Sequence, residues 1–205
     1  MTEPAGAADP AVPTHRRRIE FEVFEDERFL EVVGRLRDDR PWAVGTDRVA
    51  RVHDMTLRVV VRRADLVITE ARAEMRRFPH AECRAIEAAF GGLVGLSVAR
   101  GYTRAVQARF GRALGCTHLE FLARAVGPVV IQAVPSSAAR RAERTGAPAM
   151  MADAGAWLAD SCHVWASDGP GPEKLALGWR PGRGAYPAPS VVELRRAPPG
   201  GRPAG

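Results

Sequence analysis

Hydrophobic and polar residues alternate through most of the first half of the chain, with the period of two that is typical of strands half-buried in a sheet. Ile19, Phe21 and Val23 alternate with glutamates, and a second alternating run extends from Leu30 to Leu36 after an acidic turn. Two such runs joined by a short polar segment predict a β-hairpin.

A second hairpin is predicted downstream. Met55, Leu57 and Val59 share one face of the cleanest alternating run in the chain. A turn at residues 63–65 then returns the chain through residues 66–75, where the alternation is weaker. The first half therefore predicts four antiparallel strands, because short connections of this kind join antiparallel neighbours.

Beyond residue 80 the spacing of apolar residues changes to three and four, which is typical of amphipathic helices. A first helix is predicted from Cys83 to Leu93, and a second around Tyr102, Val106 and Phe110, stopped by Gly111. These helices follow the strands directly, as in proteins that cover one face of an antiparallel sheet with helices.

A third helix is predicted to start at His118, with Thr117 as its N-cap. Thr117 followed by Glu120 three residues later forms a capping box, which satisfies free backbone N–H groups at a helix start. Pro128 is expected to kink this helix or to end it early. Residues 135–154, rich in alanine, arginine, serine and proline, are compatible with an extension of this helix, but their composition favours a linker.

The pattern as a whole predicts an α+β fold, with an antiparallel sheet of about four strands covered on one face by two or three helices. Residues 1–14 are expected to form a disordered tail, because they hold few large apolar side chains to offset the entropy of ordering. Residues 15–169 are expected to form a single domain, and residues 170–205, rich in proline, glycine and arginine, a mobile tail.

The composition limits the kinds of partner and the cellular compartment that we expect. The 205 residues carry a net charge of +6, but nearly all the basic residues are arginines scattered among acidic ones, which predicts solvated surface charge rather than a nucleic-acid surface. There is no uninterrupted apolar run long enough for a membrane span and no secretory pattern, so we expect a cytoplasmic protein without a membrane partner. Three widely spaced cysteines indicate reduced thiols. The oligomeric state and any protein partner stay open.

Five residues that suit a metal ion stand at the ends of predicted elements. Cys116 and His118 flank the start of the third helix, where the helix dipole favours a thiolate and a neutral imidazole. Cys83 lies in the first turn of the first helix, and His53 and Asp54 directly precede the strongest strand. One sheet and two helices can bring such groups together, so these five residues are the predicted ligands of a metal site.

Other interpretations of the same residues stay open. Cys83 also fits the apolar face of its helix as a small core residue. Cys116 also suits a thiol enzyme acting on an acyl or thioester substrate, with His118 or His163 as its base. Whether Cys162 and His163 join the site is open, and so is catalysis itself. A non-catalytic protein-interaction module is the third alternative.

Several short motifs occur in order between residues 15 and 165. They are His15-Arg16-Arg17, His53-Asp54-Met55, Pro79 through Cys83, Leu93 through Gly101, and Gly115 through Leu119. On these motifs the chain resembles a bacterial family of uncharacterised proteins, a domain of unknown function. That resemblance implies no particular activity.

The segment from His53 to Cys116 also resembles, more distantly, the plan of NifU/SufE-type iron–sulfur scaffolds. In that plan an Asp precedes a β-hairpin and single cysteines head two later helices. The resemblance implies that Asp54, Cys83 and Cys116 are ligands, with His53 where that family has another cysteine. The replacement favours zinc or a mixed-ligand cluster. The function expected from the sequence is therefore a metal-binding, scaffold-like protein that handles zinc or an iron–sulfur cluster.

Overall fold

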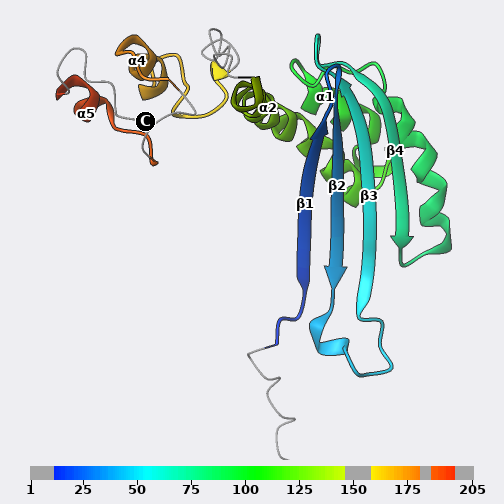
Figure 1. The fold of residues 1–205 in the computed structure, drawn as a ribbon. Coiled ribbons are helices and arrows are strands. Elements are labelled where there is room, and N and C mark those ends of the chain that lie inside the picture. The colour runs from blue at the N-terminus through cyan, green and yellow to red at the C-terminus, as the bar shows by residue number, and fades with distance from the viewer. Residues whose placement is uncertain (1–11, 146–157, 181–185, 197–205) are drawn as a thin grey trace, which may run out of the picture. The chain divides into compact units, whose positions relative to one another are not determined.

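The computed structural model describes residues 12–145, 158–180 and 186–196. Four strands form one antiparallel sheet in which neighbours along the chain are neighbours in space (Figure 1). The strands are β1 (Arg16–Glu25), β2 (Phe29–Asp39), β3 (Arg51–Arg62) and β4 (Ile68–Arg77). The two predicted hairpins and the α+β class are confirmed.

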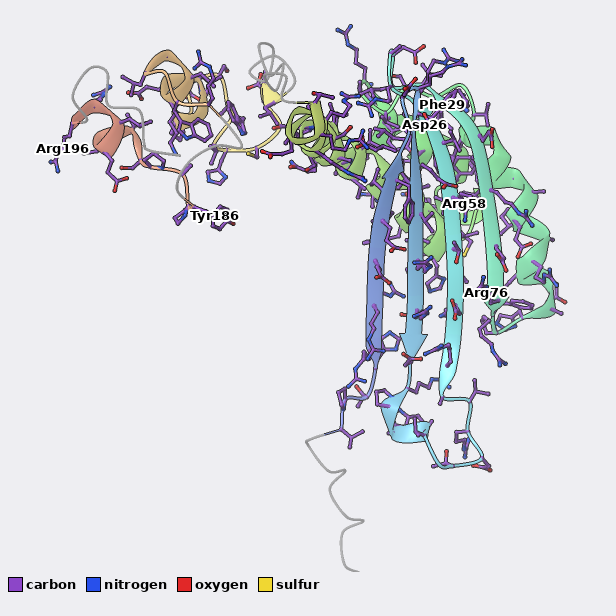
Figure 2. All side chains as sticks on the ribbon, viewed as in Figure 1. Asp26, Phe29, Arg58, Arg76, Tyr186 and Arg196 are labelled. Atoms are coloured by element: carbon purple, nitrogen blue, oxygen red, sulfur yellow. The ribbon has the colours of Figure 1, made fainter. Side chains whose placement is uncertain are left out.

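The first hairpin closes on an aspartate turn. The side chain of Asp26 accepts hydrogen bonds from the backbone N–H groups of Arg28 and Phe29, each at 2.7 Å. Asp26 and Phe29 lie together at one end of the sheet (Figure 2). These two bonds lower the pKa of Asp26, so the carboxylate holds the turn in the ionised state.

The inward face of the sheet carries the alternating apolar residues. On β2 and β3 these side chains are almost completely buried: Leu30, Val32, Leu36, Met55, Leu57 and Val59. Each strand pair is in antiparallel register, with Leu36 opposite Met55. The period of two in the sequence therefore marks the face on which the core is built.

The described helices are the 3₁₀ helices η1 (Pro41–Ala43), η2 (Ala81–Leu93) and η3 (Arg112–Leu114), and the α-helices α1 (Tyr102–Phe110), α2 (Thr117–Thr145), α4 (Pro170–Ala176) and α5 (Val191–Arg196). The buried side chains of η2, α1 and the first half of α2 supply the other side of this core. In Figure 1, α1 lies behind the sheet and η2 runs alongside β4. The rings of Phe90 on η2 and Phe110 on α1 stack with their centroids 4.6 Å apart.

Helix α2 differs from its prediction at both ends. It begins at Thr117 rather than His118, and Glu120 donates its backbone N–H to the carbonyl oxygen of Cys116, which makes Cys116 the N-cap residue. It passes Pro128 and continues to Thr145, so the first part of the predicted linker is helical. Alanine and arginine are strong helix formers, which explains the extension. The rest of that linker, from residue 146, lies outside the described residues.

The first half of α2 packs closely into the core. The hydroxyl of Tyr102 donates to the carbonyl oxygen of Ala123 at 2.8 Å, and a Cβ at Gly127 would stand 2.9 Å from the Tyr102 ring. Within the described part of the chain, α2 is the one helix long and apolar enough to pass a membrane-span test. Leu119, Leu122 and Val130, in its first half, are fully buried in the protein. The cytoplasmic location stays a prediction.

The chain divides into two compact units, Met1–Val130 and Ile131–Gly205. The first holds the sheet, η2, α1 and the start of α2. The second holds the short helices α4 and α5, within the segment expected to be a mobile tail. The single domain over residues 15–169 and the mobility of residues 170–205 stay predictions. Most of the expected N-terminal tail, residues 1–11, lies outside the described residues.

Replacing Phe90 with Ala should lower the free energy of unfolding by about 3–5 kcal/mol, because the ring is fully buried and its loss leaves a cavity. Urea unfolding measures this change. Phe24→Ala is the matched control, since the Phe24 side chain is 51% exposed on β1. A Phe90 variant no less stable than the Phe24 variant would contradict the packing.

Candidate metal centre

Three strands each place one polar residue on the core side at the same end of the sheet. Arg17 on β1 pairs with Asp38 on β2, and Asp38 pairs with His53 on β3. All three continue the inward apolar faces of their strands, where the next inward residues on β2 and β3 are Leu36 and Met55. The register of the sheet therefore gathers a cation, a carboxylate and an imidazole in one row.

Asp38 is the centre of this row. It is 1% exposed, and Arg17 holds both of its oxygens, with Nε and Nη2 each donating at 2.7 Å. The Nδ1 atom of His53 lies 3.0 Å from Oδ2, and the Nε2 atom of His15 lies 3.2 Å from Oδ1. A buried carboxylate needs such partners, because burial removes the water that solvates its charge.

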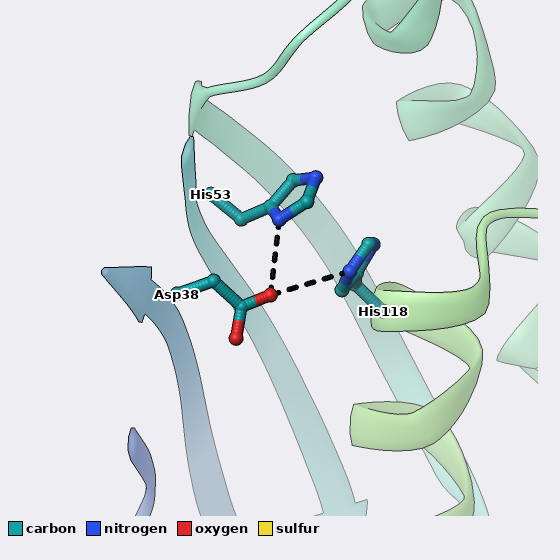
Figure 3. A group of neighbouring side chains, drawn as sticks. All are labelled: Asp38, His53 and His118. Atoms are coloured by element: carbon teal, nitrogen blue, oxygen red, sulfur yellow. Dashed lines mark hydrogen bonds and ion pairs between the residues drawn. The ribbon is translucent and has the colours of Figure 1, made fainter. Parts of the chain in front are cut away.

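The start of α2 adds a further histidine to the partners of Asp38. Nε2 of His118 lies 3.4 Å from Oδ2 of Asp38, so one carboxylate oxygen faces both His53 and His118 (Figure 3). The two imidazole rings are in contact, with centroids 3.9 Å apart and planes tilted by 35°. On its other side, Nδ1 of His118 lies 3.8 Å from Sγ of Cys116.

The charges of these groups follow from their surroundings. Burial by itself would raise the pKa of Asp38, but the hydrogen bonds and charge of Arg17, the hydrogen bond to His53 and the charge of His118 lower it to about 2. Desolvation lowers the pKa of His118, and the neighbouring His53 and Arg17 lower it further against the pull of Asp38. The site therefore holds an ionised carboxylate beside a neutral imidazole near pH 7.

Asp38, His53 and His118 are a group that could hold a metal ion. Each offers one ligand atom, and these atoms lie within 4.8 Å of one another. Two imidazole nitrogens and one carboxylate oxygen are borderline and hard donors, the set found at zinc and non-haem iron sites. It is the one such group among the residues that the structure describes.

The structure brings some of the five predicted ligands together and separates others. His53 and His118 face each other across Asp38, and Cys116 touches the far nitrogen of His118. Asp54 lies on the opposite face of β3, because successive residues of a strand point to opposite sides. There it lies 3.5 Å from Arg37 and 3.7 Å from Arg51.

Cys83 is half-buried on η2 and is not a member of the described Asp–His–His group. Cys162 and His163 are exposed residues of the second unit. Whether these two residues join a site stays open, and the ligand role of Cys83 stays a prediction.

Sequence reasoning missed Asp38, Arg17 and His15. A signal for Asp38 existed, because it continues the even-numbered positions of Leu30, Val32 and Leu36 and so lies on the buried face of β2. A charged residue at a core position is unusual unless it is paired, and it marks a candidate site. Nothing in the spacing along the chain, however, indicates that Arg17 and His53 flank it.

The fold and the cluster together define a small α+β domain with a buried Asp–His–His group at one end of its sheet. The chain belongs to the family described as "Protein of unknown function (DUF2889)", whose model matches residues 15–132. The match begins at His15 and includes every residue that contacts Asp38. No curated protein and no solved structure matches the chain. The likeness to iron–sulfur scaffolds stays a resemblance.

The low pKa of Asp38 predicts acid sensitivity. In the unfolded chain this carboxyl titrates near 3.8, whereas in the fold its pKa is about 2. Between these values the unfolded chain binds more protons, so folding loses stability as the pH falls. The contribution is about 2 kcal/mol above pH 4. Asp38→Asn should remove it, which urea unfolding in the presence of a chelator measures at pH 7 and pH 2.

The control for this experiment is Asp47→Asn, because the Asp47 side chain is 92% exposed. That variant should follow the wild type at both pH values. If the Asp38 variant and the wild type differ in stability by the same amount at pH 7 and at pH 2, the carboxylate is not held ionised by its neighbours.

Proposed function

We propose that this domain binds a divalent metal ion between Asp38, His53 and His118. The observation that carries the proposal is the single carboxylate oxygen of Asp38 that faces an imidazole nitrogen on each side, at 3.0 Å and 3.4 Å. A carboxylate oxygen and an imidazole nitrogen at these distances need either a ring N–H proton or a metal ion between them. Separations near 3 Å between donors also suit ions that bind each donor at about 2 Å.

The protonation states support metal binding. A ligating carboxylate must be ionised, and the pKa of Asp38 is lowered to about 2. A ligating imidazole must be neutral, and the pKa of His118 is lowered by burial and by neighbouring positive charge. The His118 ring lies 3.9 Å from that of His53, so a positive charge on His53 contributes to this lowering of the His118 pKa.

Arg17 acts on the same carboxylate in two opposing ways. Its guanidinium fixes the plane of the Asp38 carboxylate through two hydrogen bonds, which orients the ligand as residues behind metal ligands commonly do. Its positive charge also repels a dication. The site is thus well ordered, and we expect an affinity lower than that of a fully anionic zinc site.

The donor set favours zinc or ferrous iron over an iron–sulfur cluster. Iron–sulfur clusters are held mainly by cysteine thiolates, whereas the described group consists of two histidines and an aspartate. Three protein ligands leave coordination positions for water or a substrate. Binding alone, as in a carrier or scaffold, and metal-assisted chemistry are both compatible with this arrangement.

His118→Ala and His53→Ala should each lower zinc affinity by more than about 100-fold, since changes to residues behind metal ligands alone cost about 10–100-fold. The protein is stripped with a chelator and titrated with zinc by calorimetry. Metal content after purification is measured in parallel. Cys116→Ser, which removes only a contact to the far side of His118, should cost about tenfold.

His80→Ala is the matched control, because His80 is exposed and lies outside the group. It should bind zinc as the wild type does. A wild-type protein that shows no zinc binding tighter than about 1 mM, or a His118 variant that keeps full affinity, would overturn the proposal.

A second candidate, a thiol enzyme, is favoured by one further observation. Sγ of Cys116 lies 3.8 Å from Nδ1 of His118, whose Nε2 lies 3.4 Å from Asp38. Nucleophile, base and orienting carboxylate therefore stand in a row. Cys116 is also the N-cap residue of α2.

If this candidate is correct, Cys116 reacts rapidly with iodoacetamide in the metal-free protein, and His118→Ala slows the reaction by about 10²-fold or more. The rate is followed in a background of Cys83→Ser and Cys162→Ser, so that one thiol reports. An alkylation rate unchanged by the His118 substitution would remove the thiol candidate while leaving the metal proposal intact.

A further inference from the structure

We propose a second site on the opposite face of the sheet, one that binds a small organic anion carrying an apolar substituent. It is a cavity of about 800 Å³, a size common for sites of small metabolites. It lies between the β2–β3 loop and the outward faces of the strands, at the same end of the sheet as Asp38.

Positive charge dominates the lining. Four arginines line the cavity, Arg16, Arg51, Arg76 and Arg77, against the two aspartates Asp39 and Asp54. Arg76 lies on the sheet face turned toward the viewer in Figure 2, whereas α1 lies behind the sheet. The cavity therefore opens on the face opposite α1.

The two aspartates are already paired with arginines. Asp39 binds Arg51, itself a lining residue, at 2.9 Å and Arg18 at 3.1 Å, and Asp54 faces Arg37 at 3.5 Å and Arg51 at 3.7 Å. Among the other lining arginines, Arg76 pairs with Glu74 at 3.1 Å and is also influenced by the charge of Asp54.

Arg16 and Arg77 remain uncompensated. Within the described residues, neither makes a side-chain hydrogen bond or an ion pair. Two guanidinium groups without carboxylate partners, on the rim of one cavity, suit the oxygens of a phosphate ester or a carboxylate.

The other wall is apolar. Val44 and Val49 of the β2–β3 loop line the cavity and are 74% and 65% exposed. Two exposed valines facing a group of arginines present the apolar and charged halves of one binding surface. A ligand with an anionic head and an apolar body covers both at once.

This cavity and the Asp38 cluster use consecutive residues of the same strands. β1 turns Arg17 inward and Arg16 outward, and β2 turns Asp38 inward and Asp39 outward. β3 does the same with His53 and Asp54. The backbone of the sheet separates the two sites, so anion binding does not depend on the metal ligands.

Phenyl phosphate and inorganic phosphate are the probes, titrated into the full chain by calorimetry. Phenyl phosphate should bind about tenfold more tightly than phosphate, because its ring covers the exposed valines. Replacing Arg16 and Arg77 together with Gln should weaken phenyl phosphate binding by about tenfold or more. His118→Ala should leave it unchanged.

The matched control replaces Arg100 and Arg104 with Gln, which removes the same charge at exposed positions outside the cavity. It should keep wild-type affinity. If the Arg16/Arg77 variant does not fold, Val44→Glu tests the same point, because it adds a negative charge to the rim at a well exposed residue. This variant should also bind about tenfold more weakly.

Three results would overturn the proposal. They are the absence of saturable phenyl phosphate binding up to about 10 mM, an equal loss in the Arg100/Arg104 control, and full affinity in the Val44 variant. The first shows that the cavity takes no such anion, the second that only overall charge acts, and the third that the ligand binds elsewhere.

Discussion

The buried carboxylate of Asp38 is the group on which the functional end of this protein depends. A charge that is 1% exposed is tolerated only where other groups replace its lost water. Arg17, His53 and His118 do so from three different elements, β1, β3 and α2. The register of three strands and the position of the α2 start therefore have to be correct together. The same carboxylate couples the stability of the sheet to the chemistry of the site.

The two ring nitrogens of His118 have different neighbours. Because of this, the proposed metal binding and the proposed activation of the Cys116 thiol exclude each other. A metal ion on Nε2 requires the ring proton on Nδ1, toward Cys116, so the ring cannot then accept the thiol proton. Without a metal, Nε2–H can donate to Asp38, which leaves Nδ1 free to act as a base for Cys116. Metal binding and thiol activation are thus alternatives that use different tautomers of one histidine.

The two proposed sites lie on opposite faces of one end of the sheet because adjacent residues in a strand point in opposite directions. Arg16, Asp39 and Asp54 line the outer cavity, and their chain neighbours Arg17, Asp38 and His53 form the inner cluster. The family match over residues 15–132 spans both. The residues of the two proposed sites are thereby concentrated in the ends of β1, β2 and β3 and the start of α2.

The sequence by itself determined the four strands, the class of the fold and the placing of a thiol and an imidazole at the α2 start. Strand alternation is a local property, because the side-chain period of a strand does not depend on its partners. The same holds for the thiol and imidazole at a helix start, which a few consecutive residues specify. Two of the three residues in the candidate metal group, His53 and His118, were therefore named from sequence.

Only the tertiary structure decided which residues meet them. Asp38 and His53 are paired by the register of β2 against β3, and Arg17 joins by the register of β1. Register depends on how whole strands pack against the helices, which no short segment encodes. Alternation also separates Asp54 from its neighbour His53, although the two are adjacent in sequence. The chemistry of the individual side chains is thus local, but their convergence on one buried carboxylate is a product of the folded sheet.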